Sequence, residues 1–463
     1  MKSYFYILIA LLNIQFALAQ VFDVEAIKVS GDNDKRINLV ILSEGYQSTE
    51  FSKFIADATS FSNTMFTQSP FSEYAEYFNV YAIKVPSNES GTDHPGTATD
   101  VTEPKSPVMD VDTYFNTSFD TSNIHRLLYT YSSSAIYNVL ANSFPLYDEP
   151  VILVNSSEYG GAGGAYAVFS NGSNANDVAI HELGHSLFNL SDEYYAGDRY
   201  VREAINMTQE TSPSLVKWKN WLNSNAVNIY PYGTSGVAAT WYRPHQNCKM
   251  RYLNAPFCSV CKEGIIEKIH SLVSPINSFY PVSNTIAATS FPLNFELDLI
   301  KPNPNTLESV WTLNSTLIAS NIDAISLEET DFISGNNSLS VVVQDNSSFL
   351  RIDNHETIHV YTITWIIENT TLGIESIESE TNNYSVTMFP NPANSSINFM
   401  VESEKDSNLK VEIVFVDGKK IKSMTLSNFQ TNSIDISDLT SGIYLSNFYA
   451  NQVLISSKKL VKK

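Results

Sequence analysis

Cysteine is scarce in this chain of 463 residues, which contains 3 Cys. All three lie between residues 248 and 261. In an oxidising compartment two of them can pair and brace this loop, but the spacing does not decide which two. Cys258 and Cys261 form one C-x-x-C pair, and the lack of a second pair argues against a zinc knuckle. We therefore predict one structural disulfide and one free thiol.

Basic residues and long apolar runs are also few. The chain has 28 Lys and Arg against 49 Asp and Glu, a net charge of -21. Because this charge would repel phosphates, the composition argues against nucleic acid, and we predict no nucleic-acid partner. The acidic excess suits either solubility or calcium binding, and the sequence does not separate the two. After residue 19 no apolar run approaches the ~18 residues needed to cross a bilayer, so we predict no transmembrane segment.

The first 19 residues have the pattern of a secretory signal. Lys2 gives a basic start, an apolar run follows at residues 4–12, and small residues at 17–19 precede Gln20. We therefore exclude residues 1–19 from the fold. The mature chain is predicted to be secreted, or to lie on the outer cell surface, after signal peptide cleavage.

Histidine is scarce as well, yet two of the 8 His lie four residues apart in His181-Glu182-Leu183-Gly184-His185. On a helix, two imidazoles at this spacing share one face and can hold one zinc ion, and Glu182 can reach a water on that metal. An imidazole pair suits zinc better than calcium or magnesium, which prefer oxygen ligands. The alternative is a surface helix with two solvated histidines.

A third metal ligand is predicted shortly after this motif. Asn189 tolerates the left-handed conformation that ends a helix, and a turn there would bring Asp192 back to the metal. Glu193 is the alternative, and His245 is a weaker candidate because it lacks helical spacing to the pair. With three protein ligands, zinc keeps an open position for a water molecule and lowers the pKa of that water toward ~7. Glu182 would then act as the general base.

These residues resemble the IgA-peptidase family of metallopeptidases, whose motif is H-E-x-G-H-S-x-x-G-L-x-D-E-Y. The chain matches it at residues 181–186 and at Leu190, Asp192, Glu193 and Tyr194. It departs from the metzincin clan of zinc peptidases in two ways. The turn residue, Asn189, lies four residues after the second His instead of three, and Ser191 occupies the place of the usual third His. The resemblance implies a metzincin-like α/β catalytic domain, with a mixed sheet and an active-site helix, that hydrolyses peptide bonds.

Metzincins place a methionine in a tight turn under the zinc, and residues 247–252 resemble that turn. Met250 would form the floor of the site. Tyr252 has the Met-x-Tyr spacing seen in some metzincins, so the resemblance implies that it stabilises the oxyanion. Ordinary core packing of Met250 and an unrelated Tyr252 are the alternatives.

The segment before residue 273 alternates between two kinds of periodicity. Strands are predicted at residues 36–43, 78–85 and 150–155, and helices at 51–65 and within 123–142. This alternation predicts an α/β layer with the active-site helix packed beneath it. We assign residues 20–272 to the catalytic domain.

Two loops in this segment are candidates for the cleft. The glycine run at 160–164 has no Gly-Lys-Ser/Thr after it, which excludes a phosphate loop of the usual kind. We interpret it as a bend into an exposed edge strand, to which a peptide substrate can add as another strand. The loop at 86–95 also resembles a stretch of the IgA-peptidase family, although its composition suits a solvated turn equally well.

The rest of the chain predicts β-sandwich domains. Residues 273–372 have short alternating runs typical of a small, immunoglobulin-like β-sandwich, and residues 373–383 are polar and acidic, as in a linker. Residues 384–463 resemble the C-terminal sorting domain of type IX secretion substrates in Bacteroidota. The matching pieces are M-F-P-N-P-A at 388–393, V-D-G-K at 416–419, G-I-Y at 442–444 and the basic end at 458–463. The resemblance implies the type IX secretion machinery as a partner and a tail that is removed or attached at the surface. An ordinary adhesive β-sandwich is the alternative.

Together these features predict a secreted zinc metalloendopeptidase that acts on a protein or peptide substrate. The sequence does not identify that substrate. The alternative is a cell-surface binding or adhesion protein that uses the peptidase domain as a scaffold.

Overall fold

The structure is a computed structural model, and it describes residues 20–195, 197–198, 201–369, 384–403, 407–415 and 418–463. The predicted signal peptide at 1–19 and the predicted linker at 373–383 lie outside these residues. The chain divides into two compact units. The first comprises residues up to 284, 294–327 and 338–365, and the second comprises 285–293, 328–337 and 366–463.

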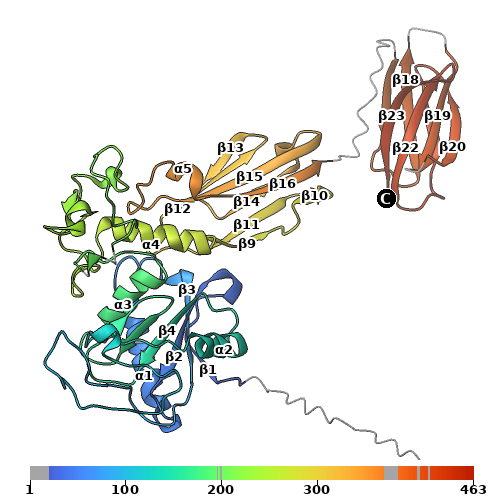
Figure 1. Ribbon diagram of the computed structural model, residues 1–463. Helices are drawn as coiled ribbons and strands as arrows, with labels where there is room; N and C mark the ends of the chain where they lie inside the picture. Colours follow the sequence, from blue (N-terminus) through green and yellow to red (C-terminus); the bar gives the residue numbers. More distant parts are fainter. Residues whose placement is uncertain (1–19, 196, 199–200, 370–383, 404–406, 416–417) are drawn as a thin grey trace, which may run out of the picture. The chain divides into compact units, whose positions relative to one another are not determined.

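A six-stranded mixed sheet forms the centre of the N-terminal region (Figure 1). Its strands, in sheet order, are β1 (Val24–Lys28), β3 (Phe78–Ile83), β2 (Ile37–Glu44), β4 (Glu149–Val154), β6 (Ala167–Ser170) and β5 (Gly161–Ala162). Strands β3, β2, β4 and β6 are parallel, whereas β1 and β5 are antiparallel edge strands. All residues of β2, β4 and β6 are buried, as expected for parallel strands covered on both faces. The predicted strands at 36–43, 78–85 and 150–155 are thus confirmed as β2, β3 and β4.

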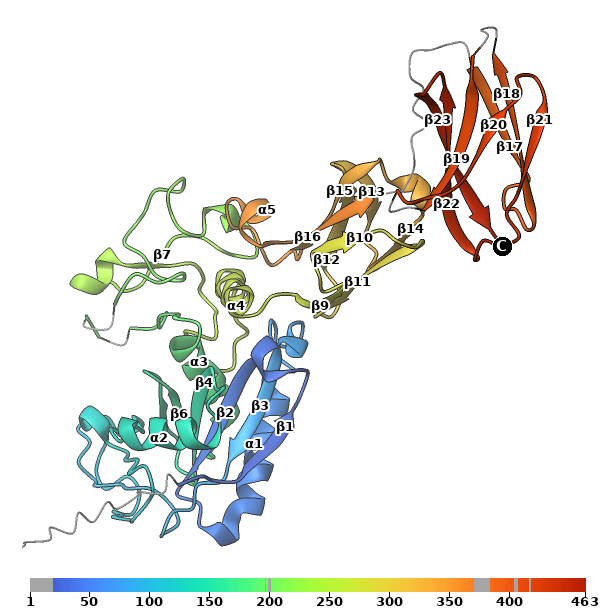
Figure 2. The same cartoon turned by 90° about the vertical axis from the view of Figure 1, so that its right-hand side faces the viewer.

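Helices cover both faces of this sheet. They are α1 (Phe51–Met65), α2 (Ser133–Ser143) and α3 (Ala175–Ser186), while α4 (Ser259–Leu272) lies beyond α3 and shares its core cluster (Figure 1 and Figure 2). Leu39 and Ile41 of β2 join one core cluster with α1, α3 and α4, whereas Val40 and Leu42 join another with α2. Successive side chains of a strand point to opposite faces, so the sheet separates two apolar layers. The helices predicted at 51–65 and within 123–142 are confirmed as α1 and α2.

A long segment with little regular structure, residues 84–132, joins β3 to α2 (Figure 2). Glu44, a buried carboxylate at the end of β2, organises part of it. Its oxygens accept hydrogen bonds from the Thr113 hydroxyl (2.7 Å), the Phe115 N–H (2.9 Å) and the Thr117 N–H (3.0 Å). Isolated bridges such as Asp93 with Ser118 supply further backbone pairing. The segment is therefore fixed by specific polar contacts instead of by a helix or sheet of its own.

Residues 187–258 contain only two short strands among the described residues, β7 (Tyr230–Pro231) and β8 (Tyr242–Arg243), which pair antiparallel. Buried tryptophans and tyrosines hold this region to the core. Trp221, for example, is buried, and its Nε1–H donates to Glu263 of α4 at 2.8 Å.

Two β-sheets follow α4. The smaller has the order β14 (Ala324–Leu327), β11 (Leu293–Leu299), β9 (Ile276–Tyr280). The larger has the order β10 (Thr285–Ala287), β16 (Val360–Asn369), β15 (Gly335–Asp345), β12 (Leu307–Leu313), β13 (Thr316–Ser320), and the short helix α5 (His355–Ile358) precedes β16. Trp311 and Trp365 stack with ring centroids 6.0 Å apart, and Phe295 packs on Trp365 at 5.1 Å. Aromatic packing therefore supplies much of this core.

A buried polar contact joins these sheets to the N-terminal region within the first unit. Asp345 at the end of β15 accepts hydrogen bonds from Nε2 of His270 on α4 (2.8 Å) and from the hydroxyl of Tyr74 (2.5 Å). All three side chains are buried. Because unpairing a buried carboxylate is costly, this contact specifies how the two parts of the unit pack.

The C-terminal residues form two further sheets. Their orders are β17 (Tyr384–Phe389), β18 (Ser396–Ser403), β21 (Thr431–Asp435), and β20 (Lys420–Leu426), β19 (Leu409–Phe415), β22 (Gly442–Ala450), β23 (Val453–Lys462). The core between them consists entirely of residues from 384 onward. The molecule as described is thus mixed α/β with a β-rich C-terminal region. Among the described helices, none has the length and apolar character that a membrane span requires.

Candidate metal centre and substrate cleft

Helix α3 places His181 and His185 on one face, one turn apart. Their Nε2 atoms are 3.2 Å from each other, and the ring planes are nearly perpendicular at 87°. Val178, Leu183 and Leu187 are buried in the core beneath, which fixes the face that the helix presents. The apolar period of the sequence therefore determines where the two imidazoles point.

The chain turns back immediately after α3. Asn189 has a φ of 55°, the left-handed conformation predicted for it, and the Leu190 N–H donates to the Gly184 carbonyl at 2.8 Å. This turn brings Oδ1 of Asp192 to 3.1 Å from Nε2 of His181 and 3.2 Å from Nε2 of His185. Ligand atoms bound to one tetrahedral zinc at about 2.0–2.1 Å lie about 3.3 Å from one another. The three atoms therefore have the spacing of three corners of such a site.

Both imidazoles are oriented by backbone carbonyls on their outer side. Nδ1 of His181 lies 3.0 Å from the Lys249 carbonyl, and Nδ1 of His185 lies 2.8 Å from the Leu190 carbonyl. An N–H that donates to each carbonyl leaves the lone pair of Nε2 directed at Asp192. Outer contacts of this kind are usual for histidines that bind metals.

The electrostatics of the three groups favour a positive charge between them. Burial alone would raise the pKa of Asp192, but hydrogen bonds to His181 and His185 hold that pKa well below its usual range. Burial alone would lower the pKa of His185, yet the Asp192 hydrogen bond and charge raise it to about 9. In the metal-free chain a bound proton supplies this positive charge, and a divalent cation would supply it equally well.

Glu182 extends from the same helix into the cleft beside the imidazoles. Burial raises its pKa, while the charges of His181 and His185 lower it. Gly163 passes close by: a Cβ on it would lie 2.7 Å from Oε2 of Glu182 and 3.0 Å from Cβ of His185. A side chain at position 163 would therefore require Glu182 or His185 to move, so a glycine here lets the chain pass close to α3.

Met250 lies directly beneath α3. It is fully buried, and a Cβ on Gly184 would meet its Sδ at 2.8 Å. The Met250 carbonyl accepts the Glu193 N–H at 2.7 Å, which ties this turn to the segment that carries Asp192. The structure thus places Met250 where the predicted floor of the site would be.

The other candidate ligands lie elsewhere. Oε1 of Glu193 accepts a hydrogen bond from Nδ2 of Asn206 (3.1 Å) and lies 3.3 Å from Sγ of Cys261, so it faces away from the imidazole pair. Nδ1 of His245 accepts the N–H of Asn247 at 2.9 Å. Of the two carboxylates weighed from the sequence, Asp192 is the one that the structure places against His181 and His185.

The predicted disulfide is wrong: Cys248, Cys258 and Cys261 are all free thiols and all buried. The sulfurs of Cys248 and Cys261 are 3.6 Å apart, whereas a disulfide requires about 2.05 Å. Together with Glu193 the three thiols form a compact buried cluster. Sequence spacing correctly indicated that the cysteines gather at the methionine turn, but it carried no information on their bonding.

A cavity of about 700 Å³ opens over the imidazoles and Glu182. Residues at 121–131, 161–164 and 181–195 line it, together with Arg202. This volume is in the range of ligand-binding clefts, about 300–1,000 Å³. Edge strand β5 forms part of the lining, as the interpretation of the glycine run requires.

Two side chains that sequence reasoning did not single out as functional line this cavity. The Tyr194 ring lies over His181 with centroids 6.4 Å apart, and Arg126 lies 5.9 Å from the same tyrosine ring. Burial raises the pKa of Tyr194 to about 12, which keeps its hydroxyl protonated. Tyr252 is 51% exposed, stacks against Arg251, and is not among the residues that line this cavity. Tyr194 was visible as part of the family motif, whereas nothing in the sequence indicated Arg126.

Comparison with known proteins identifies two regions of the chain. Residues 25–236 match the family described as IgA Peptidase M64, and residues 387–463 match the Secretion system C-terminal sorting domain. No curated protein sequence matches the chain.

Solved structures resemble the chain only weakly. Dimeric latent PorU from Porphyromonas gingivalis has 13% identity over 40% of this chain and 20% of that chain, with a TM-score of 0.16. A beta-glucuronidase from Faecalibacterium prausnitzii has 13% identity over 34% of this chain and 33% of that chain, with a TM-score of 0.15. The fibronectin(III)-like modules of Clostridium thermocellum CbhA have 14% identity over 40% of this chain and 91% of that chain, with a TM-score of 0.14.

Proposed function

We propose, on the premise that residues 25–236 belong to the IgA Peptidase M64 family, that this chain is a secreted zinc-dependent endopeptidase. In this proposal residues 20–272 form the catalytic domain, residues 273–372 a β-sandwich domain and residues 384–463 the sorting domain. The observation that carries the proposal is the mutual spacing of 3.1 and 3.2 Å among the ligand atoms of His181, His185 and Asp192.

These three residues would hold zinc, and the open side of the site faces the cavity. When bound, zinc would supply a Lewis acid for the scissile carbonyl and lower the pKa of a water molecule. The Glu182 carboxylate would accept the proton of that water and pass it to the nitrogen of the leaving amine. Glu182 lines the cavity together with His181 and His185, so its carboxylate could reach both the water and the leaving nitrogen.

The substrate peptide would lie along the edge of the sheet. The Gly161 N–H donates to the Arg126 carbonyl at 3.1 Å, and Ala162 pairs with Val168 of β6, so the part of the edge that a substrate strand can use begins at Gly163. Backbone hydrogen bonds to residues 163 and 164 would hold the peptide extended across the cleft. Such binding reads the main chain of a substrate and suits a protein or peptide of varied sequence.

Tyr194 would stabilise the oxyanion that forms at the scissile carbonyl. Its support is its position over His181 and its protonated hydroxyl at neutral pH. Tyr252, the residue predicted from the Met-x-Tyr spacing, is the competing candidate and would have to turn toward the cleft from its exposed position.

The C-terminal domain would deliver the enzyme to the cell exterior. The sorting-domain match at 387–463 implies the type IX secretion machinery as a partner. A surface binding protein that uses the peptidase domain as a scaffold is not favoured, because such a scaffold has no physical need for Glu182 beside an intact ligand set.

The proposal is tested on purified chain with a broad peptide library. Wild-type protein should cleave the library, lose activity on treatment with a chelator and regain it with zinc. Glu182→Gln should keep its zinc while turnover falls by about 10² to 10⁴, the usual contribution of a positioned general base. His245→Ala is the matched control and should change neither. Zinc-loaded wild-type protein that cleaves nothing, or full turnover in Glu182→Gln, would overturn the proposal.

A further inference from the structure

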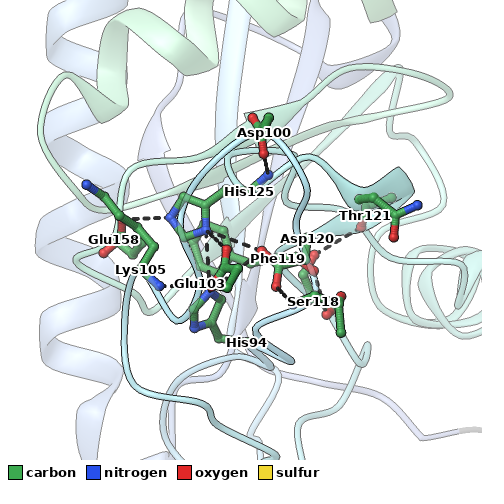
Figure 3. Close-up of polar contacts among 12 residues, drawn as sticks. His94, Asp100, Glu103, Lys105, Ser118, Phe119, Asp120, Thr121, His125 and Glu158 are labelled. Carbon is green, nitrogen blue, oxygen red and sulfur yellow. Dashed lines mark hydrogen bonds and ion pairs between the residues drawn. The ribbon is translucent and has the colours of Figure 1, made fainter.

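A second group of convergent ligands lies in the segment between β3 and α2, apart from the candidate active site. His94, Glu103, Asp120 and His125 direct their side chains toward one another (Figure 3). His94 is 2% exposed, Asp120 5% and His125 6%. The Glu103 side chain is 11% exposed, so three buried and one partly buried ionisable side chain are gathered where water has little access.

The distances within this group suit one small cation. Nδ1 of His125 lies 3.2 Å from Oδ1 of Asp120, 3.3 Å from Oε1 of Glu103 and 3.4 Å from Nε2 of His94. Nε2 of His94 lies 3.6 Å from Oδ1 of Asp120 and 3.8 Å from Oε2 of Glu103. Nitrogen and oxygen ligands of a tetrahedral zinc lie about 3.3 Å from each other. These five distances are thus close to those between ligands of one tetrahedral ion, and ligand atoms of all four residues lie within 4.8 Å of one another.

The outer nitrogen of each imidazole already has a partner (Figure 3 shows the Glu158 contact). Nδ1 of His94 lies 3.1 Å from the Pro107 carbonyl, and Nε2 of His125 lies 3.1 Å from Oε1 of Glu158. Since a carbonyl and a carboxylate only accept hydrogen bonds, the N–H of each ring is on its outer side. Where the inner nitrogens carry no proton, they present lone pairs to each other and to two carboxylates.

This convergence of electron pairs is unfavourable unless something positive lies at the centre. Oε1 of Glu103 is buried and makes no hydrogen bond, although it lies among these atoms. A divalent cation would satisfy that oxygen and both lone pairs at once. Two imidazoles with two carboxylates favour zinc over calcium and magnesium, which prefer shells made of oxygen alone.

We propose that His94, Glu103, Asp120 and His125 form a second zinc site, and that this site is structural. Four protein ligands fill a tetrahedral shell and leave no position for a substrate or a reactive water. The proposal does not depend on peptidase activity, because it concerns residues outside the cleft.

The site would hold one wall of the cleft in place. Asp120 and His125 flank residues 121–124, of which Thr121, Ser122 and Ile124 line the cavity. The backbone here is in the left-handed region at Asp120 (φ 58°), Ser122 (φ 55°) and Asn123 (φ 61°). Because non-glycine residues rarely adopt this conformation, an external restraint on both ends of the short loop would preserve it.

The test counts zinc in a chain whose candidate active site has been removed. The His181→Ala/His185→Ala variant is dialysed against metal-free buffer, and its zinc content is measured by inductively coupled plasma mass spectrometry. We expect it to retain about one zinc per chain. Adding Glu103→Gln, which keeps the shape of the side chain, should weaken that zinc at least about 10-fold in competition with a chelator. Adding His94→Ala should abolish it.

The buried thiol cluster provides the matched control. Cys258→Ser in the same background should leave the retained zinc in place. Cobalt substituted for zinc gives a second readout, because a tetrahedral site with two imidazoles absorbs visible light strongly and the Glu103→Gln chain should lose this absorption. A background variant that retains no zinc, or zinc that is lost with Cys258→Ser and kept with Glu103→Gln, would overturn the proposal.

Discussion

The clusters around His185 and around His125 use the same ligand types and differ in how many ligands they have and how open they are. The first brings together two imidazoles and one carboxylate beside a cavity of about 700 Å³. The second brings together two imidazoles and two carboxylates, and His94, Asp120 and His125 among them are buried. Zinc in a three-ligand site can act on a substrate, whereas zinc in a four-ligand site stabilises the fold. The comparison indicates that the access of substrate and water to the metal, more than the chemical type of the ligands, decides what a metal would do at each site.

Asp192 offers the largest test of this contrast, because it is the proposed carboxylate ligand of the open cluster, which comprises His181, His185 and Asp192. Asp192→Ala should lower the zinc affinity of that cluster by more than the roughly 10- to 100-fold that outer contacts contribute, and activity should disappear with the metal. Competition with a chelator measures the affinity. Glu193→Gln, which alters the neighbouring carboxylate, should keep zinc and activity. The reverse order would transfer the third ligand to Glu193.

Gly163, which follows edge strand β5, tests how tightly this edge of the sheet packs against Glu182 and His185. Gly163→Ala introduces a methyl group 2.7 Å from Glu182 Oε2, so the carboxylate or the edge strand must shift. We expect kcat/KM to fall by about 100-fold while zinc content stays constant, because a displacement near 1 Å has about this cost. Gly442→Ala is the control, since the nearest atoms to its added methyl lie 4.0 Å away. Equal activity in both variants would contradict the packing argument.

Tyr194 and Tyr252 make different predictions for the same role. Tyr194→Phe should lower kcat by about 10-fold, less than the loss of a sole oxyanion donor, because Arg126 remains in the cleft. Tyr252→Phe should leave kcat unchanged, since the side chain is half-exposed and outside the cavity lining. Steady-state kinetics on a single library peptide measures both. A loss confined to Tyr252→Phe would restore the assignment based on the Met-x-Tyr spacing.

Removal of residues 384–463 should have the smallest effect on catalysis, because this part carries neither cluster. Its core is made only of its own residues, so the remaining chain keeps its packing. We expect kcat/KM of the purified truncated enzyme to be unchanged while the protein fails to reach the cell exterior, as fractionation would measure. Normal export of the truncated chain would refute the sorting role.

The open cluster could be predicted from the sequence because its geometry is local. His181 and His185 share a helix face through their spacing, and Asn189 indicated the turn that returns Asp192. The buried strands β2 and β4 were equally visible, since continuous aliphatic runs are typical of parallel strands covered on both faces.

The four-ligand cluster around His125 could not be predicted, because its ligands do not recur at the spacing of a helix or a strand. His94, Glu103, Asp120 and His125 are spread over an irregular segment whose course depends on tertiary contacts such as those of Glu44. The placement of Tyr194 over His181 and the unpaired thiols likewise depend on side-chain directions that spacing alone does not give.

The three free cysteines also make the packing beneath the candidate active site open to measurement. Cys248 and Cys261 are fully buried and Cys258 is 6% exposed, next to the Met250 turn. A thiol reagent in solution can therefore react only when this region opens, so the rate of alkylation reports the free energy of that opening. Counting labels by intact mass would follow this local motion in the working enzyme, without any introduced probe.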